Sequence, residues 1–477
     1  MGFKIIAGRA KTGKSTYIYD EINKQILSKS KKNLLLVVPE QMTYQSEYEV
    51  IDRISSSGIM SLEVLSFKRL GYKVLEEVGG LKVQEINQYG KIMLLKKIFE
   101  ENKDKLKLFK KASRQEGFLR EFESLISELK QNMVSVEFLE QILKHKVTEK
   151  DNNLLNSKLE DILTIYAEVN KHTKDRFFDE EDKMDLFIHA VAKSEYIRNS
   201  DIWIDGFESF NGQRLKLIKE LVKYAGSVTV SLNIDPACIN VLQNTEDWEA
   251  FKTVYDTFKT LTDDEISPEL IMLKENTFSE EIKILEKNMF SLKDERFSIT
   301  TDNIQIRSSL NPYTETEKAA LEIISLVRDH GCRWKDIGVA VGDMDSYSIN
   351  IKKVFTQFEI PFFLDMKRDI MGNPLTKFIL SLFDMFIYNF KHDSVFEFLK
   401  TGFSLLNYDE VSKLENFALQ YGIEGDKWFR AFRFKCEGIE YFNNLREKFA
   451  SGMKEAKKQF KKLDNALDIT LFLFDFL

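Results

Sequence analysis

Residues 8–15 read Gly8-Arg9-Ala10-Lys11-Thr12-Gly13-Lys14-Ser15, which matches the pattern G-x-x-x-x-G-K-[ST] at every defined position. A loop of this kind points successive backbone N–H groups inward, where they surround phosphate oxygens. The two glycines allow backbone angles and close approaches that a side chain prevents. Lys14 reaches the β- and γ-phosphates, and the Ser15 hydroxyl is a hard oxygen ligand for magnesium. The pattern predicts that these eight residues, with Thr16 after them, bind a nucleoside triphosphate, and we expect ATP with Mg²⁺.

The segments on either side of this loop have the patterns of apolar residues that are typical of strands and helices in an α/β sheet. Residues 3–7 are a short apolar run, and residues 16–27 have apolar side chains at helical spacing. Residues 34–38 form an uninterrupted apolar run closed by Pro39, which is typical of a parallel strand buried on both faces. Residues 64–67 are a further candidate strand. Strand, helix and strand in this order predict an open parallel sheet.

A later apolar segment supplies an acidic residue that suits this loop. Residues 202–204 read Ile-Trp-Ile and are followed by Asp205, and in P-loop sites a strand commonly ends in the carboxylate that supports the metal. We predict this role for Asp205; the alternative is an aspartate that caps the next helix. Where a P-loop motor usually has a glutamate base, this chain has Gly206, which carries no side chain. Glu208 is the candidate catalytic carboxylate beside Asp205, and it fits a surface residue equally well.

Composition limits the class of protein. Of 477 residues, 43% are hydrophobic and 30% charged, which fits folded cores, and the net charge of −7 argues against a uniformly basic nucleic-acid coat. Cys238, Cys332 and Cys436 lie too far apart to suggest zinc or an iron–sulfur cluster, and so sparse a set indicates a reducing compartment. No signal peptide is apparent and no apolar run is long enough to cross a bilayer, so we expect a cytoplasmic protein with no membrane role. The apolar end, residues 471–477, suggests a part of something longer.

The rest of the chain alternates between helical and strand-like texture. Residues 87–199 lack proline, repeat apolar residues every three or four positions, and predict a helical insertion. Its early basic residues are either solvated helix surface or a nucleic-acid contact: Lys105, Lys107, Lys110, Lys111, Arg114 and Arg120. Strand texture returns at residues 202–204 and 228–232. A further α/β block begins near residue 304, with a helix over 319–327 and strands over 337–341 and 361–364, and residues from 374 onward are helical again.

Several of these stretches together resemble the AddB (RexB-type) subunit of bacterial AddAB helicase–nucleases. They are the N-terminal loop, Val38-Pro39-Glu40-Gln41-Met42-Thr43, Val64-Leu65-Ser66-Phe67-Lys68-Arg69-Leu70, Ile202-Trp203-Ile204-Asp205-Gly206-Phe207-Glu208-Ser209-Phe210, Glu317 and Asp336-Ile337-Gly338-Val339-Ala340-Val341. The resemblance runs the whole length in order, and the run from Ile202 to Phe207 is its most specific part.

The resemblance implies a RecA-like, superfamily-1 helicase layout with large helical insertions. Residues 1–86 and 200–300 would form the first RecA-like lobe and 87–199 its insertion, 301–373 the start of a second lobe, and 374–477 a second insertion. It also implies DNA and an AddA-type helicase–nuclease subunit as partners in double-strand-break repair, with Phe67 and Arg69 as candidate DNA contacts. A core phenylalanine and a solvated arginine are equally acceptable interpretations of those two. The family's nuclease domain and iron–sulfur cysteines would lie beyond Leu477.

This chain departs from active helicases of that superfamily in ways that suggest a degenerate motor. No glutamine-containing adenine-recognition segment precedes Gly8, and residues 228–232 are followed by Asn233-Ile234-Asp235 instead of G-D-x-x-Q. Gly342-Asp343 stands where a motor would place an arginine. The resemblance thus points to a helicase-like scaffold that binds nucleotide. Two alternatives stay open: a small-molecule P-loop kinase, and an interaction scaffold that binds ATP without hydrolysis.

Overall fold

The computed structural model describes residues 2–53, 62–79, 84–146, 153–173, 177–240, 248–262, 267–289, 298, 300–364, 366 and 370–476. The chain divides into two compact units, Met1–Gln305 and Ile306–Leu477. In the described residues no helix is long and apolar enough to cross a membrane.

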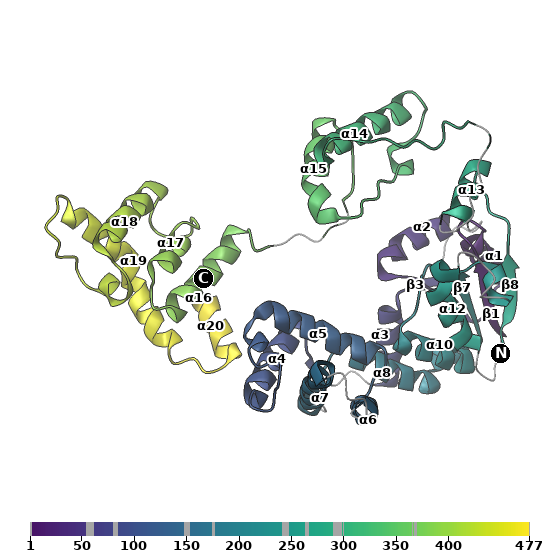
Figure 1. Ribbon diagram of the computed structural model, residues 1–477, viewed down its shortest axis with the longest axis horizontal. Helices are drawn as coiled ribbons and strands as arrows, with labels where there is room; N and C mark the ends of the chain where they lie inside the picture. The colour runs from purple at the N-terminus through teal and green to yellow at the C-terminus, as the bar shows by residue number, and fades with distance from the viewer. Residues whose placement is uncertain are drawn as a thin grey trace. The chain divides into compact units, whose positions relative to one another are not determined.

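The first unit is built on a six-stranded sheet in which every pairing is parallel (Figure 1). The strand order is β3-β2-β6-β7-β1-β8. The strands are β1 (Gly2–Gly8), β2 (Asn33–Val37), β3 (Leu62–Leu65), β6 (Ser200–Ile204), β7 (Ser227–Asn233) and β8 (Glu269–Leu273). The α/β prediction is confirmed, including the buried apolar strand over residues 34–38. The edge strand β8 was not predicted from the sequence. Its five residues, Glu-Leu-Ile-Met-Leu, are partly buried or exposed, and as a sequence they fit a helix as well as a strand.

Helices cover both faces of the sheet. On one face α1 (Lys14–Leu27) and α2 (Thr43–Arg53) bury Ile18, Ile22 and Val50 against β2 and Trp203 of β6. The other face is covered by α3 (Phe67–Val78), α8 (Glu180–Ala190), α10 (Gly212–Tyr224) and α12 (Trp248–Thr262), which share one large core. The smaller elements of this unit are η1 (Glu40–Met42), η3 (Val191–Lys193), α9 (Glu195–Arg198), α11 (Pro236–Asn240), α13 (Glu280–Asn288) and the paired two-residue strands β4 (Gln84–Glu85) and β5 (Phe177–Phe178).

The helical insertion has a core of its own. Its elements are α4 (Gln88–Asn102), η2 (Ala112–Arg114), α5 (Glu116–Gln131), α6 (Val136–Lys146) and α7 (Asn153–Thr173). Phe99, Phe122 and Ile165 are fully or almost fully buried at its centre. The later helices α8 and α9 were expected in the same insertion, but Phe187 and Ile197 pack in the core under the sheet. The independent helical core therefore ends with α7.

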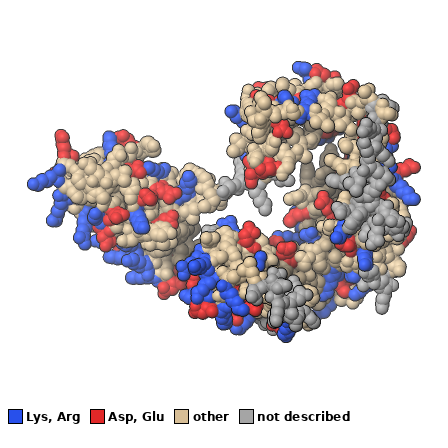
Figure 2. Space-filling view, viewed as in Figure 1, with Lys and Arg blue, Asp and Glu red and all other residues tan. Residues whose placement is uncertain are grey.

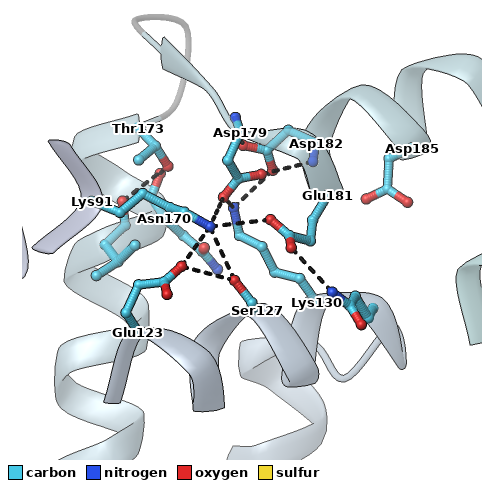
Figure 3. Close-up of polar contacts among 12 residues, drawn as sticks. Lys91, Glu123, Ser127, Lys130, Asn170, Thr173, Asp179, Glu181, Asp182 and Asp185 are labelled. Atoms are coloured by element: carbon cyan, nitrogen blue, oxygen red, sulfur yellow. Dashed lines mark hydrogen bonds and ion pairs between the residues drawn. The ribbon is translucent and has the colours of Figure 1, made fainter. Parts of the chain in front are cut away.

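Buried charges join this insertion to the sheet layer, as Figure 3 shows. Lys130 of α5 reaches Asp179 at 2.7 Å and Asp182 at 2.9 Å, and its side chain is only 9% exposed. The two aspartates also form the capping box that starts α8. A second lysine, Lys91 of α4, contacts Glu123 at 2.6 Å and Glu181 of α8 at 3.3 Å. The insertion is thus held to α8 by ion pairs with little access to water.

These contacts change the proton affinity of the aspartates. Burial raises the pKa of Asp182 to about 6, and the neighbouring charge of Asp179 adds to the shift. Burial opposes ionisation of Asp179 as well, but the Lys130 ammonium outweighs it and lowers the pKa of that carboxyl. Of the two acids, Asp182 is therefore the one that takes up a proton first as the pH falls.

The second unit contains two separate hydrophobic cores. The first lies between α14 (Pro312–Arg328) and α15 (Met344–Gln357), with η5 (Trp334–Asp336) on the connection, so the helix predicted over 319–327 is confirmed. The strands predicted over 337–341 and 361–364 are absent from the described residues. A strand needs a hydrogen-bonded neighbour, whereas Ile337, Val341 and Leu364 pack part-buried against these two helices.

The second core is helical and rich in aromatic side chains. It is formed by α16 (Pro374–Ile387), α17 (His392–Leu399), α18 (Tyr408–Tyr421), η6 (Gly425–Phe429), α19 (Ile439–Phe460) and α20 (Ala466–Phe476). Trp428 and Phe390 are fully buried in it. The helical texture predicted after Pro374 is confirmed.

Candidate nucleotide-binding site

The loop between β1 and α1 has the shape that a phosphate-binding loop requires. β1 ends at Gly8 and α1 begins at Lys14, with Gly13 between them in the left-handed region at φ 88°. Side chains rarely adopt that angle, so residue 13 favours glycine. At Gly8 the limit is space, because a Cβ there would lie 2.3 Å from Thr12 Oγ1 and 2.9 Å from the carbonyl oxygen of Leu273. Each glycine of the pattern therefore has its own physical reason.

Lys14 folds its ammonium group back over the loop. Its Nζ donates to the carbonyl oxygens of Gly8 at 2.8 Å and Arg9 at 2.7 Å, and to Asn233 Oδ1 at 3.2 Å. Burial lowers the pKa of Lys14, and nearby carboxylates, led by Asp205, offset part of that effect. A partly desolvated ammonium whose direct partners are neutral oxygens attracts an anion strongly.

Asp205 lies directly after β6, at the same carboxyl edge of the sheet as the loop. The residue is 6% exposed, and its carboxylate accepts a hydrogen bond from the Ser231 hydroxyl of β7. Its backbone N–H donates to the carbonyl oxygen of Val37 at 3.0 Å. The helix-capping alternative is wrong, because Asn211 caps α10. The carboxylate is thus fixed beside the loop by the neighbouring strands.

The position after Asp205 offers no second carboxylate. Gly206 has φ 78°, and a Cβ there would lie 3.2 Å from Met42 Sδ. Glu208 is exposed in the loop before α10, and within the described ranges no hydrogen bond or ion pair joins it to Asp205. Of the two carboxylates expected to act together, Asp205 alone is buried beside the loop.

The other loop residues make hydrogen bonds that hold the loop in its conformation. Ser15 is partly buried in the first turn of α1, and the exposed Thr16 accepts a hydrogen bond from Arg53 Nη1 at 3.3 Å. Thr12 Oγ1 donates to the carbonyl oxygen of Arg9 at 2.9 Å, which closes the loop on itself.

Arg9, the second residue of the pattern, anchors the loop to distant elements. Its Nε donates to Glu286 Oε1 at 2.9 Å, its Nη2 donates to the Glu286 carbonyl oxygen at 2.9 Å, and its Nη1 donates to Asp235 Oδ2 at 3.0 Å. The guanidinium also lies over the ring of Phe251, 5.0 Å from its centre. Sequence reasoning missed Glu286 and Asp235 as partners of the loop, since nothing in their spacing marks them.

The two candidate DNA contacts, Phe67 and Arg69, face different pockets. Phe67 is 4% exposed, with its ring 5.1 Å from that of Phe207 and the Arg214 guanidinium 5.9 Å from the centres of both rings. This group lines a pocket of about 290 Å³ that also holds Lys68. Arg69 is exposed and lines another hollow beside β3. Nothing in the sequence marks Arg214 as part of this group. Burial lowers the pKa of its guanidinium.

The six basic residues at the start of the insertion are all exposed. Figure 2 shows lysine and arginine side chains gathered over this part of the first unit, around α4. Lys107 pairs with Glu160, and Lys110 lies 3.0 Å from Asp104, so part of this charge is compensated locally.

The residues around the loop fit Mg²⁺ and a nucleotide by their chemistry. A Cβ at Gly8 would clash with its neighbours and the φ of Gly13 disfavours a side chain, so the loop keeps the compact backbone that phosphate-binding loops require. The Ser15 hydroxyl and the Asp205 carboxylate are both hard oxygen donors. No cluster of three or more His, Cys, Asp or Glu side chains suited to a metal occurs within the described ranges.

Comparison with known proteins shows the family of the chain. The family model described as ADDB, N-terminal, matches residues 5–292, which include β1, the loop, Asp205 and the whole helical insertion. The chain belongs to this family. The match begins in the strand that leads into Gly8, so the phosphate-type loop and its sheet lie inside the family's own domain.

Three curated relatives of the chain share one description. The chain is 34% identical over 503 residues to the B subunit of the ATP-dependent helicase/deoxyribonuclease from Alkaliphilus oremlandii (strain OhILAs), aligning all of this chain with 43% of that protein. The proteins of the same name from Thermoanaerobacter sp. (strain X514) and Clostridium novyi (strain NT) are each 33% identical, over 497 and 486 residues, with 43% and 42% of their lengths covered. The chain therefore spans less than half the length of these curated relatives.

Proposed function

We propose that this chain is the N-terminal, nucleotide- and DNA-binding part of the B subunit of a helicase–nuclease that processes double-strand breaks for recombinational repair. Membership of the family and the name shared by its relatives support this assignment. The observation that carries it is the loop from Gly8 to Ser15, set between a buried strand and a helix with Asp205 at the same sheet edge.

The site is suited to hold ATP by its triphosphate. Backbone N–H groups between Gly8 and Gly13, the positive end of α1 and the Lys14 ammonium would bind phosphate oxygens. Ser15 and Asp205 would hold Mg²⁺, which supplies positive charge that neutralises the phosphates. Lys14 now bonds to Gly8 and Arg9 and would turn from them to the incoming phosphate.

We further propose that this site binds ATP with little or no turnover. Hydrolysis needs a group that orients and deprotonates a water molecule. Gly206 has no such group, and Glu208 is exposed and makes no contact with Asp205 within the described ranges. The departures at Asn233 and Asp235 point the same way, because those side chains already bond to Lys14 and Arg9. Within the complex, translocation would fall to an AddA-type partner subunit.

DNA contact is proposed at the exposed Arg69, whose guanidinium suits a phosphate. Phe67 is 4% exposed and packs against Phe207 and Arg214, which fits the core interpretation of this residue. The nuclease activity named for the relatives would belong to a part of the protein beyond this chain, as would an iron–sulfur cluster. We propose that the complex acts in the cytoplasm.

Calorimetry with Mg–ATP tests the nucleotide assignment. Wild-type protein should bind ATP, and Lys14→Ala should weaken binding at least tenfold, since a charge-assisted contact is worth about 1.5–3 kcal/mol. Lys24→Ala, an exposed lysine on the same helix, is the matched control and should bind normally. Equal binding by Lys14→Ala and Lys24→Ala would overturn the assignment. Phosphate release above background that Glu208→Gln abolishes would refute the claim of negligible turnover.

A further inference from the structure

A second pocket opens beside the loop, on the side away from Asp205. It lies at the carboxyl ends of β7, β1 and β8 and measures about 810 Å³. Arg9 and Asp235 line it on one side, and Lys274, Asn276, Lys283 and Glu286 line it from the segment that follows β8. This volume is within the range of pockets that bury small organic ligands.

The pocket contains a polar atom that the fold leaves without a partner. Asn276 Oδ1 is buried from solvent and accepts no hydrogen bond from the described residues. A buried carbonyl oxygen without a donor destabilises the fold, so proteins seldom leave one unless something else binds it. Because Asn276 lines the pocket, a turn of its side chain would present this acceptor to a ligand that carries an N–H group.

The pocket adjoins the loop of residues 8–15. Thr277, the residue after Asn276, donates its backbone N–H to the carbonyl oxygen of Lys11 at 3.2 Å. From the other side, Arg9 belongs to the loop through its backbone and to the pocket through its side chain. A single molecule can therefore have one end on the loop and the other beside Asn276.

The pocket lining combines charges of both signs with an apolar patch. The Arg9 guanidinium is paired with Glu286 and Asp235, and the other charged lining residues are Lys274, Glu275, Lys283 and Lys287. Met272, Leu273 and Pro236 supply apolar surface against which a flat heterocycle can pack.

We propose that this pocket receives the base and ribose of the nucleotide whose phosphates occupy the loop, with Asn276 accepting a hydrogen bond from the 6-amino group of adenine. This inference rests on the proposed function, because it assigns the other half of the same ligand. It makes Asn276 a specificity-determining residue.

Three ligands separate the two halves of the site: Mg–ATP, Mg–purine riboside triphosphate, which lacks the 6-amino group, and Mg–tripolyphosphate, which lacks base and sugar. Affinities for wild-type protein are measured by calorimetry. We expect ATP to bind roughly 3- to 10-fold more tightly than the purine riboside analogue, as one neutral hydrogen bond allows. Tripolyphosphate should bind more than tenfold more weakly than ATP.

The variant Asn276→Leu should bind ATP and the purine riboside analogue equally while keeping its affinity for tripolyphosphate. Asn23→Leu is the matched control, since Asn23 Oδ1 is also buried without a partner but lies on α1 and does not line the pocket. It should retain the wild-type preference for ATP.

The outcomes are distinct. Binding of none of the three ligands would overturn the proposed function itself. Binding of ATP and tripolyphosphate with equal affinity would refute the base pocket while leaving the phosphate loop intact. A preference for ATP that Asn276→Leu leaves unchanged would refute the role of Asn276.

Discussion

Replacing Lys130 with methionine would break the link between the helical insertion and the sheet layer while keeping the shape of the side chain. Lys130 is 9% exposed and lies 2.7 Å from Asp179, whose side chain is 4% exposed. Removing one partner of a buried ion pair leaves an uncompensated charge and costs about 3–5 kcal/mol. Asp182, at 25% exposed, keeps some access to water, so we expect the lower end, about 3 kcal/mol.

Hydrogen–deuterium exchange read by mass spectrometry would localise this effect. A loss of about 3 kcal/mol corresponds to roughly a hundredfold faster exchange through local opening. The acceleration should appear in α5 and α8, which the network joins, and leave the aromatic core of the second unit unchanged.

The matched control is Lys97→Met. Lys97 is 64% exposed and 3.8 Å from Glu101, so its removal should cost less than about 0.5 kcal/mol. Adding Asp182→Asn to Lys130→Met should restore part of the protection, because it removes one of the stranded charges. Exchange in α5 and α8 that is the same for Lys130→Met and Lys97→Met would refute the reasoning.

Four further outcomes are expected. As the pH falls from 7 to 5, the free energy of unfolding of the wild type should rise by about 1 kcal/mol relative to that of Asp182→Asn. The pKa of Asp182 in the folded state, about 6, exceeds the ordinary aspartate pKa of 3.8, so the folded state takes up the proton first. If this is wrong, urea titrations will give the same difference between the two proteins at both pH values. Ser15→Ala should weaken ATP binding on the order of tenfold in Mg²⁺ but not in EDTA, as calorimetry can measure. Arg69→Ala should lower the salt dependence of single-stranded DNA binding by about 0.7 in the slope of log K against log salt, and an unchanged slope in fluorescence anisotropy would remove Arg69 from the interface. Gly206→Ala should destabilise the protein by about 1–2 kcal/mol in thermal or urea unfolding because of its φ of 78°, and a neutral result would contradict the backbone argument.

Local sequence predicted the parts of the fold that depend on local physics. The apolar run of β2 and the glycine-bounded loop after β1 carry their structure in a few consecutive residues, and both are found as predicted. The strands expected over 337–341 and 361–364 have the same apolar texture, yet they are not strands. A sheet depends on neighbours that a short run cannot specify, and there the apolar side chains pack on two helices instead.

The candidate site likewise contains some residues that the sequence marks and others that it does not. Lys14 and Asp205 could be identified because motif and strand texture mark them, while the partners of Arg9 could not. Glu286 and Asp235 are ordinary carboxylates on a helix and after a strand, and only the tertiary fold brings them to the loop. Asn276 could not be predicted for a different reason. What marks it is a buried Oδ1 without a hydrogen-bond donor, and only the folded structure shows that.

The position of β1 in the sheet has a consequence for how the chain folds during synthesis. Gly2 of this strand pairs with Ser227 and Lys4 with Glu269, so both of its neighbours emerge from the ribosome long after β1 itself. Until then a strongly apolar strand has no edge to join, and pairings between residues so distant in sequence form slowly. The phosphate-type loop, whose shape depends on β1 and on the segment after β8, is therefore completed only after the helical insertion has been made.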